Sequence, residues 1–175
     1  MKNTGNGPAL NRFDDLKEQQ MIWTVRESGL GATAHAPDKK ITWEGWEDAA
    51  VAPDKVGAYL RDFRKLLEKF GYGCDLYGHF GQGCIHTRID FDLETHDDIQ
   101  TFHAFLNEPT DLVVSYGGSL SGEHGAGQSK AQCLTQRFDE ELVLDFGALK
   151  AIWDPDRQIR PGKTSTAQLP TERLA

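Results

Sequence analysis

Cysteine is scarce in this chain, and its pattern excludes several kinds of site. The three cysteines are Cys74, Cys84 and Cys133, and no two of them form a C-x-x-C pair. This spacing excludes a zinc ribbon, and an odd number of unpatterned cysteines predicts free thiols rather than a disulfide framework. We therefore expect a reducing environment and a cytoplasmic location.

Long apolar runs and an excess of basic residues are also missing. No stretch of 18 apolar residues occurs, so we expect no membrane span. The 19 Lys and Arg are outnumbered by 27 Asp and Glu, which gives a net charge of −8 and a pI near 5.2. Because phosphate neutralisation needs a basic face, we expect no nucleic-acid partner. Residues 1–11 lack the apolar core of a secretory signal peptide.

What remains is the composition of one globular domain. The 175 residues are 38% hydrophobic and 26% charged, which is enough for a single hydrophobic core. We expect this domain to span residues 13–163. Residues 1–12 are expected to form a flexible tail, and residues 164–175 a second tail or a severed linker.

The pattern of apolar residues predicts helices in several places. One helix is expected over residues 13–27, and a clearer one begins at Pro53 and ends at Gly71, with apolar side chains at the 3.6-residue period between them. Thr95 and Asp98 have the spacing of a capping box for another helix. Pro109 is expected to start a new segment. A last helix is expected after the cap at Asp139 and before the Asp-Pro pair at 154–155.

Between these helices the sequence predicts a β-hairpin with arms over residues 74–79 and 84–93. The second arm alternates, with one apolar set on one face: Ile85, Thr87, Ile89, Phe91 and Leu93. The opposite face carries His86 and Arg88, so we expect helices on the apolar face and a substrate pocket on the polar one. The predicted fold is α+β, an antiparallel sheet with helices packed on one face.

Two glycine-rich stretches carry the candidate functional residues. Residues 78–86 read G-H-F-G-Q-G-C-I-H, and residues 117–127 read G-G-S-L-S-G-E-H-G-A-G. Two imidazoles and a carboxylate are a common ligand set for zinc or a similar divalent ion, and a further histidine beside the carboxylate is suited to act as a base. These side chains are His79, His86, Glu123 and His124.

The expected hairpin turn brings the first two of these histidines together. A two-residue turn at Gln82-Gly83 sets His79 opposite His86, with Cβ atoms roughly 5 Å apart on one face of the sheet. Two imidazoles so placed can share one metal ion. A different register would change which residues face each other.

Plainer interpretations compete with each of these assignments. A single histidine on a strand is usually structural, and the second glycine-rich stretch can be a simple connection. Cys84 is a possible ligand or nucleophile, but a small half-buried residue is the commoner case. The second stretch lacks the G-K-[ST] ending of a phosphate-binding loop, and Glu123 would repel phosphate.

Four motifs resemble the C-terminal domain of FAD-linked oxidases of the vanillyl-alcohol-oxidase type, the group that includes glycolate oxidase, D-lactate dehydrogenase and D-2-hydroxyglutarate dehydrogenase. They are W-T-V-R-E at 23–27, G-H-F-G-Q-G-C-I-H at 78–86, G-G-S-L-S-G-E-H-G at 117–125 and W-D-P-D-R-Q-I-R-P-G-K at 153–163. The resemblance covers about residues 13–163. It is greatest to the bacterial proteins that fuse this oxidase to an iron–sulfur domain, which share H-F-G-Q-G-C and G-A-T-A-H.

The resemblance implies the cap domain of a flavoenzyme that oxidises a small 2-hydroxy acid by hydride transfer to FAD. The divalent metal of the family, often zinc, implies the ligands His79, His86 and Glu123. The expected base for the substrate hydroxyl is His124. The expected contact for the substrate carboxylate is Arg26, with Arg88 as a further polar contact.

The chain also departs from the family pattern. The commoner hairpin motif reads G-D-G-N-L-H, whereas Gln82 and Cys84 stand at two of its positions here. Nothing resembles the flavin-pyrophosphate loop, and no cysteine cluster for iron–sulfur ligation follows. The implied partners are a flavin-binding domain or subunit and an iron–sulfur domain. Two alternatives stay open: a metal-binding remnant or regulatory module without redox activity, and a metal hydrolase with His124 as base.

Overall fold

The computed structural model describes residues 11–37, 40–161 and 163. Apart from residues 11 and 12, the two predicted terminal segments, 1–12 and 164–175, lie outside the described residues. The described part is α+β, as predicted, with helices and one small antiparallel sheet.

The sheet has three antiparallel strands in the order β1–β3–β2. They are β1 (Ala49–Ala50), β2 (Cys74–Tyr77) and β3 (Cys84–Ile89). The central strand β3 is buried along its whole length, because helices cover one face and the chain around residues 42–48 lies at the other. Both strands are shorter than the predicted arms, since β2 ends at Tyr77 and β3 at Ile89. Within β3 the expected alternation holds, because Ile85 and Ile89 enter the hydrophobic core while His86 takes part in a polar cluster.

The predicted hairpin register is wrong by two residues. His86 pairs with Tyr77, and His79 lies beside Cys84, whose N–H donates to the carbonyl of His79 at 3.2 Å. The turn is longer than two residues because it contains a 3₁₀ turn, η2 (Phe80–Gln82), closed by Gly83 in the left-handed region at φ 82°. A shift of two residues preserves the faces of both strands, so His79 still reaches the neighbourhood of His86.

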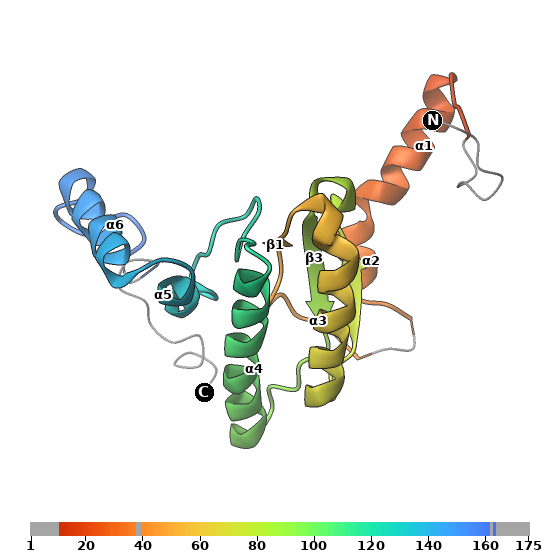
Figure 1. Ribbon diagram of the computed structural model, residues 1–175. Helices are drawn as coiled ribbons and strands as arrows, with labels where there is room; N and C mark the ends of the chain where they lie inside the picture. Colours follow the sequence, from red (N-terminus) through yellow and green to blue (C-terminus); the bar gives the residue numbers. More distant parts are fainter. Residues whose placement is uncertain (1–10, 38–39, 162, 164–175) are drawn as a thin grey trace.

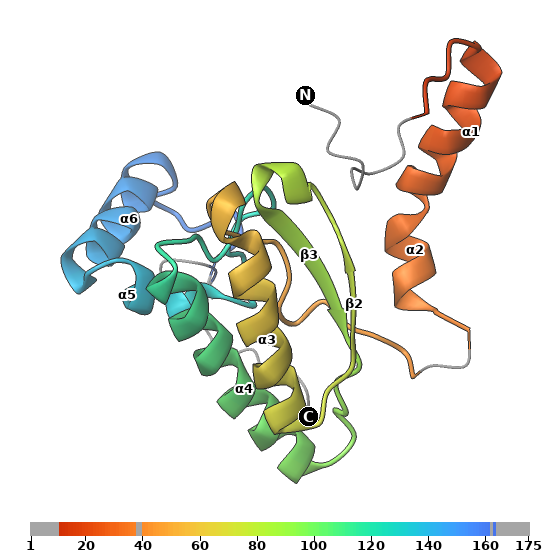
Figure 2. The same cartoon turned by 45° about the vertical axis from the view of Figure 1, so that its right-hand side comes forward.

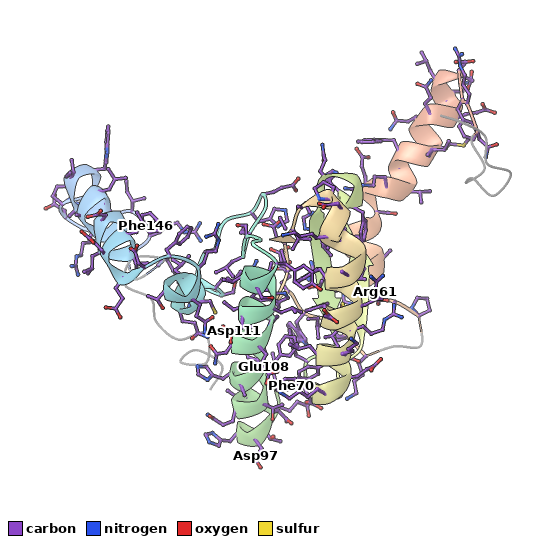
Figure 3. All side chains as sticks on the ribbon, in the orientation of Figure 1. Arg61, Phe70, Asp97, Glu108, Asp111 and Phe146 are labelled. Atoms are coloured by element: carbon purple, nitrogen blue, oxygen red, sulfur yellow. The ribbon has the colours of Figure 1, made fainter. Side chains whose placement is uncertain are left out.

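Two long helices form the layer on one face of the sheet, as Figures 1 and 2 show. They are α3 (Val56–Phe70), which follows the short η1 (Pro53–Lys55), and α4 (His96–Ser115). Figure 3 labels Phe70 on α3 where the two helices meet, and its ring packs edge-on against Phe105 of α4 at 5.3 Å. The core beneath them includes Trp46, Tyr59, Phe63, Ile85, Ile89, Phe105 and Leu106.

The predicted ends of these helices are confirmed, with one exception. Gly71 caps α3 in the left-handed conformation, and Thr95 and Asp98 form the reciprocal capping box of α4. Pro109 does not start a new segment, because α4 continues through it. A proline in a helix interior costs roughly 3 kcal/mol. Burial of Pro109, Thr110 and Val113 offsets this cost, and the Thr110 hydroxyl donates to the carbonyl of Leu106 at 2.8 Å.

The remaining helices lie around this centre. They are α1 (Leu16–Glu27), α2 (Gly29–Ala34), η3 (Ala131–Cys133), α5 (Leu134–Arg137) and α6 (Glu140–Trp153). Figure 1 shows α1 and α6 projecting from opposite sides of the molecule, and neither helix has a buried residue. Within the described ranges, no helix is long and apolar enough to cross a membrane.

Candidate metal and substrate site

Two histidines converge on one carboxylate at the tip of the hairpin. His86 projects from β3 and is 4% exposed, whereas His79 and Glu123 come from half-exposed loop positions. The Nε2 atom of His79 lies 3.5 Å from Oε1 of Glu123, and the Nε2 atom of His86 lies 3.6 Å from Oε2 of the same carboxylate. Glu123 therefore stands between the two imidazoles.

Each of these two spacings, taken alone, fits a pair of ligands on one divalent metal. With metal–ligand bonds of about 2.0–2.1 Å, neighbouring ligand atoms of a tetrahedral zinc site lie roughly 3.3–3.4 Å apart. The two nitrogen–oxygen distances are close to that value and longer than a hydrogen bond. In addition, Nδ1 of buried His86 has no hydrogen-bond partner among the described residues. Carboxylate oxygens of Glu47 and Asp48 lie near this nitrogen, both at 3.6 Å.

Asp48 holds the loop that carries Glu123. Its fully buried carboxylate accepts hydrogen bonds from the backbone N–H groups of Glu123 at 3.0 Å and His124 at 2.7 Å, and from the Ser121 hydroxyl. Burial alone would raise the pKa of Asp48, but these hydrogen bonds and one from Cys84 outweigh it and hold the pKa well below its ordinary value. The residue adopts a left-handed φ of 64°, which turns its side chain toward this loop.

A buried lysine fastens the same loop from its other side. Lys130 is 1% exposed and donates to the carbonyl of Leu120 at 2.7 Å and to the carbonyl of Glu47. Its ammonium lies 5.6 Å from the ring centroid of Trp46. Burial lowers the pKa of Lys130, and the nearby carboxylates of Glu47 and Asp48 oppose that shift. The loop at 120–124 is thus fixed by one buried anion and one buried cation.

His124 stacks on His86 and faces a second carboxylate. The two rings are parallel within 3°, with centroids 4.8 Å apart. Nδ1 of His124 lies 3.1 Å from both carboxylate oxygens of Glu47. This hydrogen bond raises the pKa of His124 above its ordinary value, although partial burial works against it.

The two predicted arginine contacts have different surroundings. Arg26, in the last turn of α1, has Nη2 3.5 Å from Nε2 of His79. Arg88 lies two residues beyond His86 on the same face of β3, and its guanidinium donates to Glu44 at 2.7 Å. The structure thus brings Arg26 to the cluster by direct contact and holds Arg88 in an ion pair beside it.

Cys84 is a buried neighbour of the cluster. Burial, followed by its hydrogen bond to Asp48, raises the pKa of Cys84 to about 12. A neutral thiol is a poor nucleophile and a poor ligand, which favours the small buried residue among the two interpretations. Two overlapping groups of ligand-type atoms lie within 4.8 Å of one another, and both contain Asp48 and His86. One adds Cys84 and Glu123 and the other adds Glu47 and His124, so the predicted ligand His79 lies outside both groups. Donors already occupy the oxygens of Asp48, so Glu123 is the better carboxylate ligand for an ion in the group that contains it.

Sequence reasoning missed Glu47, Asp48 and Lys130. Asp48 lies 73 residues from Ser121, and Lys130 lies 83 residues from Glu47. Their roles follow from tertiary contacts, and the segment W-E-D at 46–48 has no spacing that is specific for such a role. In the structure, Asp48 and Lys130 stand out as buried charged groups, and Glu47 stands out by its contacts with two histidines.

A cavity of about 380 Å³ adjoins Glu123, between the loop at 119–126 and α5. Arg137 and Phe138 also line it. Its volume falls within the usual range for small-molecule sites.

The fold and the cluster together define an α+β domain that carries a candidate metal site at the edge of a short antiparallel sheet. The chain belongs to the family described as FAD linked oxidases, C-terminal domain, whose match covers residues 2–164. This membership confirms the resemblance inferred from the four motifs.

Several curated relatives are similar to the chain. It is 32% identical to D-2-hydroxyglutarate dehydrogenase of Pantoea ananatis, over 87% of this chain and 15% of the relative. It is 28% identical to glycolate oxidase subunit GlcD of Bacillus subtilis, over 91% of this chain and 33% of the relative. It is 34% identical to D-lactate dehydrogenase of Archaeoglobus fulgidus, over 66% of this chain and 25% of the relative. The chain therefore spans a minor part of each.

Proposed function

We propose that this chain is the substrate- and metal-binding domain of an FAD-dependent D-2-hydroxy-acid dehydrogenase that acts on a small acid of the D-lactate, D-2-hydroxyglutarate or glycolate type. The flavin would be bound mainly by a domain or subunit outside this sequence. The observation that carries the proposal is the convergence of His79 and His86 on Glu123, at 3.5 and 3.6 Å. The names of the relatives supply the class of substrate.

In this proposal three side chains hold a divalent ion, most simply Zn²⁺. The histidines His79 and His86 present Nε2 atoms toward Glu123, which gives the N,N,O donor set that zinc accepts. The ion, when bound, would polarise the hydroxyl and carboxylate of the acid and lower the pKa of that hydroxyl. Asp48 and Lys130 keep the loop of Glu123 in place without touching the substrate.

The remaining residues would bind and deprotonate the substrate. His124 would take the hydroxyl proton on its imidazole, while Arg26 would pair with the substrate carboxylate through its forked guanidinium. Arg88 would contribute to binding if the acid displaced or joined Glu44 at its guanidinium. FAD, when bound, supplies the acceptor for the hydride that leaves C2.

The proposal extends to the surroundings of the domain. We propose that the functional unit spans residues 13–163, that an iron–sulfur domain is a further partner, and that the protein resides in the cytoplasm. The buried thiols Cys84 and Cys133 form no disulfide, which suits a reducing compartment.

Metal content tests the ligand assignment. Protein purified without chelator should carry about one divalent ion per chain, as one three-ligand site implies. His86→Ala, His79→Ala and Glu123→Gln should each lose most of it. His96→Ala is the matched control, because His96 is an exposed histidine in the first turn of α4 and lies outside the cluster. Equal metal content in the wild type and all three ligand variants would refute the site.

Turnover with the flavin-binding partner tests the chemistry. With D-2-hydroxy acids and an artificial electron acceptor, His124→Ala should lower kcat by about 10²–10⁴-fold, the usual contribution of a positioned base, and should keep its metal. Wild-type turnover by this variant would place the base elsewhere. Metal binding without turnover in the wild-type assembly would favour the non-redox alternative.

A further inference from the structure

The carboxylate of Glu47 lies against both stacked histidines. Its Oε2 atom is 3.1 Å from Nδ1 of His124 and 3.6 Å from Nδ1 of His86. The first distance is a hydrogen bond, and the second is just beyond one. The carboxylate of Glu47 therefore faces Nδ1 of two histidines, the proposed metal ligand His86 and the proposed base His124.

Glu47 is held rigidly enough to act on these rings. Its side chain is 20% exposed, and its neighbours in sequence, Trp46 and Asp48, are fully buried. The backbone carbonyl of Glu47 accepts a hydrogen bond from the buried ammonium of Lys130. By contrast, the nearby Glu44, which pairs with Arg88, has a side chain that is 68% exposed.

A carboxylate at this position selects one tautomer of its histidine. An ionised carboxylate can only accept hydrogen bonds, so Nδ1 of His124 must carry the proton. The other nitrogen, Nε2, is then left with the lone pair that a base requires. A free neutral imidazole prefers the opposite tautomer, with its proton on Nε2. Without Glu47 the proposed base would mostly present an N–H where it needs a lone pair.

We propose that Glu47 is a positioning residue that fixes His124 in its Nδ1–H tautomer and holds the ring parallel to His86. The inference rests on the function proposed above for His124, and extends it to a residue that touches neither substrate nor metal. His86 differs from His124, because Oδ1 of Asp48 offers its Nδ1 a second acceptor at 3.6 Å. Loss of Glu47 should therefore affect His124 more than His86.

Ring-nitrogen NMR on the isolated, ¹⁵N-labelled chain tests the tautomer directly. At a pH well above the raised pKa of His124, where its ring is neutral, the wild type should show His124 as the Nδ1–H form. In Glu47→Ala the signal should move toward the Nε2–H form. In the isosteric Glu47→Gln, whose amide can donate as well as accept, the Nδ1–H population should fall below that of the wild type. The second variant keeps the test valid if the first does not fold.

Glu44→Gln is the matched control, since it removes a carboxylate from the same segment that contacts Arg88 instead of a histidine. The tautomer of His124 should be unchanged in it. An Nε2–H form in the wild type, or an unchanged tautomer in folded Glu47→Ala, would overturn the inference.

Turnover in the assembled enzyme supplies the second readout. Glu47→Ala should lower kcat by about 10–100-fold, the range for outer partners of site histidines, with little change in KM. A general loss of folding would instead lower the amount of active enzyme and leave the tautomer of the folded fraction intact. If His124→Ala is fully active while the tautomer depends on Glu47, the proposed base is wrong and the positioning contact stands. If His124→Ala is inactive and Glu47→Ala turns over normally, the inference fails and the proposed function survives.

Discussion

At the scale of single residues, Asp48 does more for the site than any residue that the sequence singles out. Its carboxylate is fully buried and joins β3, through Cys84, to the loop of Glu123 and His124. A charge in such a place is tolerated only when hydrogen bonds replace its hydration. Hydrogen bonds from Ser121, Glu123 and His124 replace the hydration of Asp48. The same hydrogen bonds hold the loop that carries Glu123 and His124 in place.

Asp48→Asn should therefore destabilise the protein by about 2–4 kcal/mol. One carboxylate oxygen would be replaced by an amide NH₂ group, which cannot accept the hydrogen bonds that the N–H and O–H donors now make. Asparagine tolerates the left-handed backbone of this position, so the effect reports the hydrogen bonds and not φ. Urea unfolding at neutral pH measures it. Asp145→Asn, an exposed position on α6, should change the free energy of unfolding by less than about 0.5 kcal/mol. Similar midpoints for both variants would contradict this account.

Residue chemistry explains which parts of the site could be found in the sequence. His79, His86, Glu123 and His124 stand among glycines, and such side chains in such segments indicate chemistry before any fold is known. Glu47 could not be found this way, because a glutamate in a polar segment is most often solvated. Only the approach of chain segments about 77 residues apart gives it two histidines to face.

At the scale of elements, the hairpin between β2 and β3 determines where the first histidine lies. Its register depends on the turn, and a turn of two residues cannot be told from a longer one by glycine content alone. The faces of the strands were predictable, because they depend on the period of two, which a two-residue shift leaves unchanged. The continuation of α4 through Pro109 was not predictable, because burial and not local propensity decides it.

Gly81 and Gly83 of this turn should respond very differently to substitution. Gly83 has φ 82°, and a Cβ atom there would collide with the carbonyl oxygen of Val51 beside β1. We expect Gly83→Ala to destabilise the protein by about 2 kcal/mol or more, through backbone strain and displacement of the turn. Gly81 has no atom within 4 Å of a built Cβ, so Gly81→Ala should leave the free energy of unfolding within about 0.5 kcal/mol of the wild type. Chemical denaturation of the pair gives the comparison, and equal midpoints would argue against the turn described here.

At the scale of the whole molecule, helices α1 and α6 differ from the centre in leaving many of their apolar side chains exposed. Helix α1 leaves apolar side chains in solvent, among them Leu16 at 78% and Val25 at 73% exposure, and α6 leaves Trp153 at 80%. The apolar periodicity predicted both helices correctly, but it could not say how much of their apolar surface the described chain leaves exposed. A periodic pattern states which side of a helix is apolar and not what covers it.

Removal of residues 1–28 should consequently change stability little. Because α1 contributes no buried residue, the shortened chain should unfold within about 1 kcal/mol of the full chain, as expected for changes outside the core. It should also retain its metal, since His79, His86 and Glu123 all remain. Parallel denaturation and elemental analysis of the two proteins check this. A large loss of stability would mean that α1 is part of the core after all.

The placement of Arg26 has a consequence for when the proposed substrate would bind tightly. The guanidinium reaches Nε2 of His79 at 3.5 Å from a helix that the core does not hold. The proposed metal ligands and base thus lie at the folded centre, whereas the proposed contact for the substrate carboxylate lies on α1, which has no buried residue. We therefore expect two separate contributions to the affinity for the acid. The first is present once the chain is folded, and the second requires a partner that fixes α1 and Arg26 in place. A chain that is well folded and loaded with metal would then still bind its substrate weakly until it is assembled.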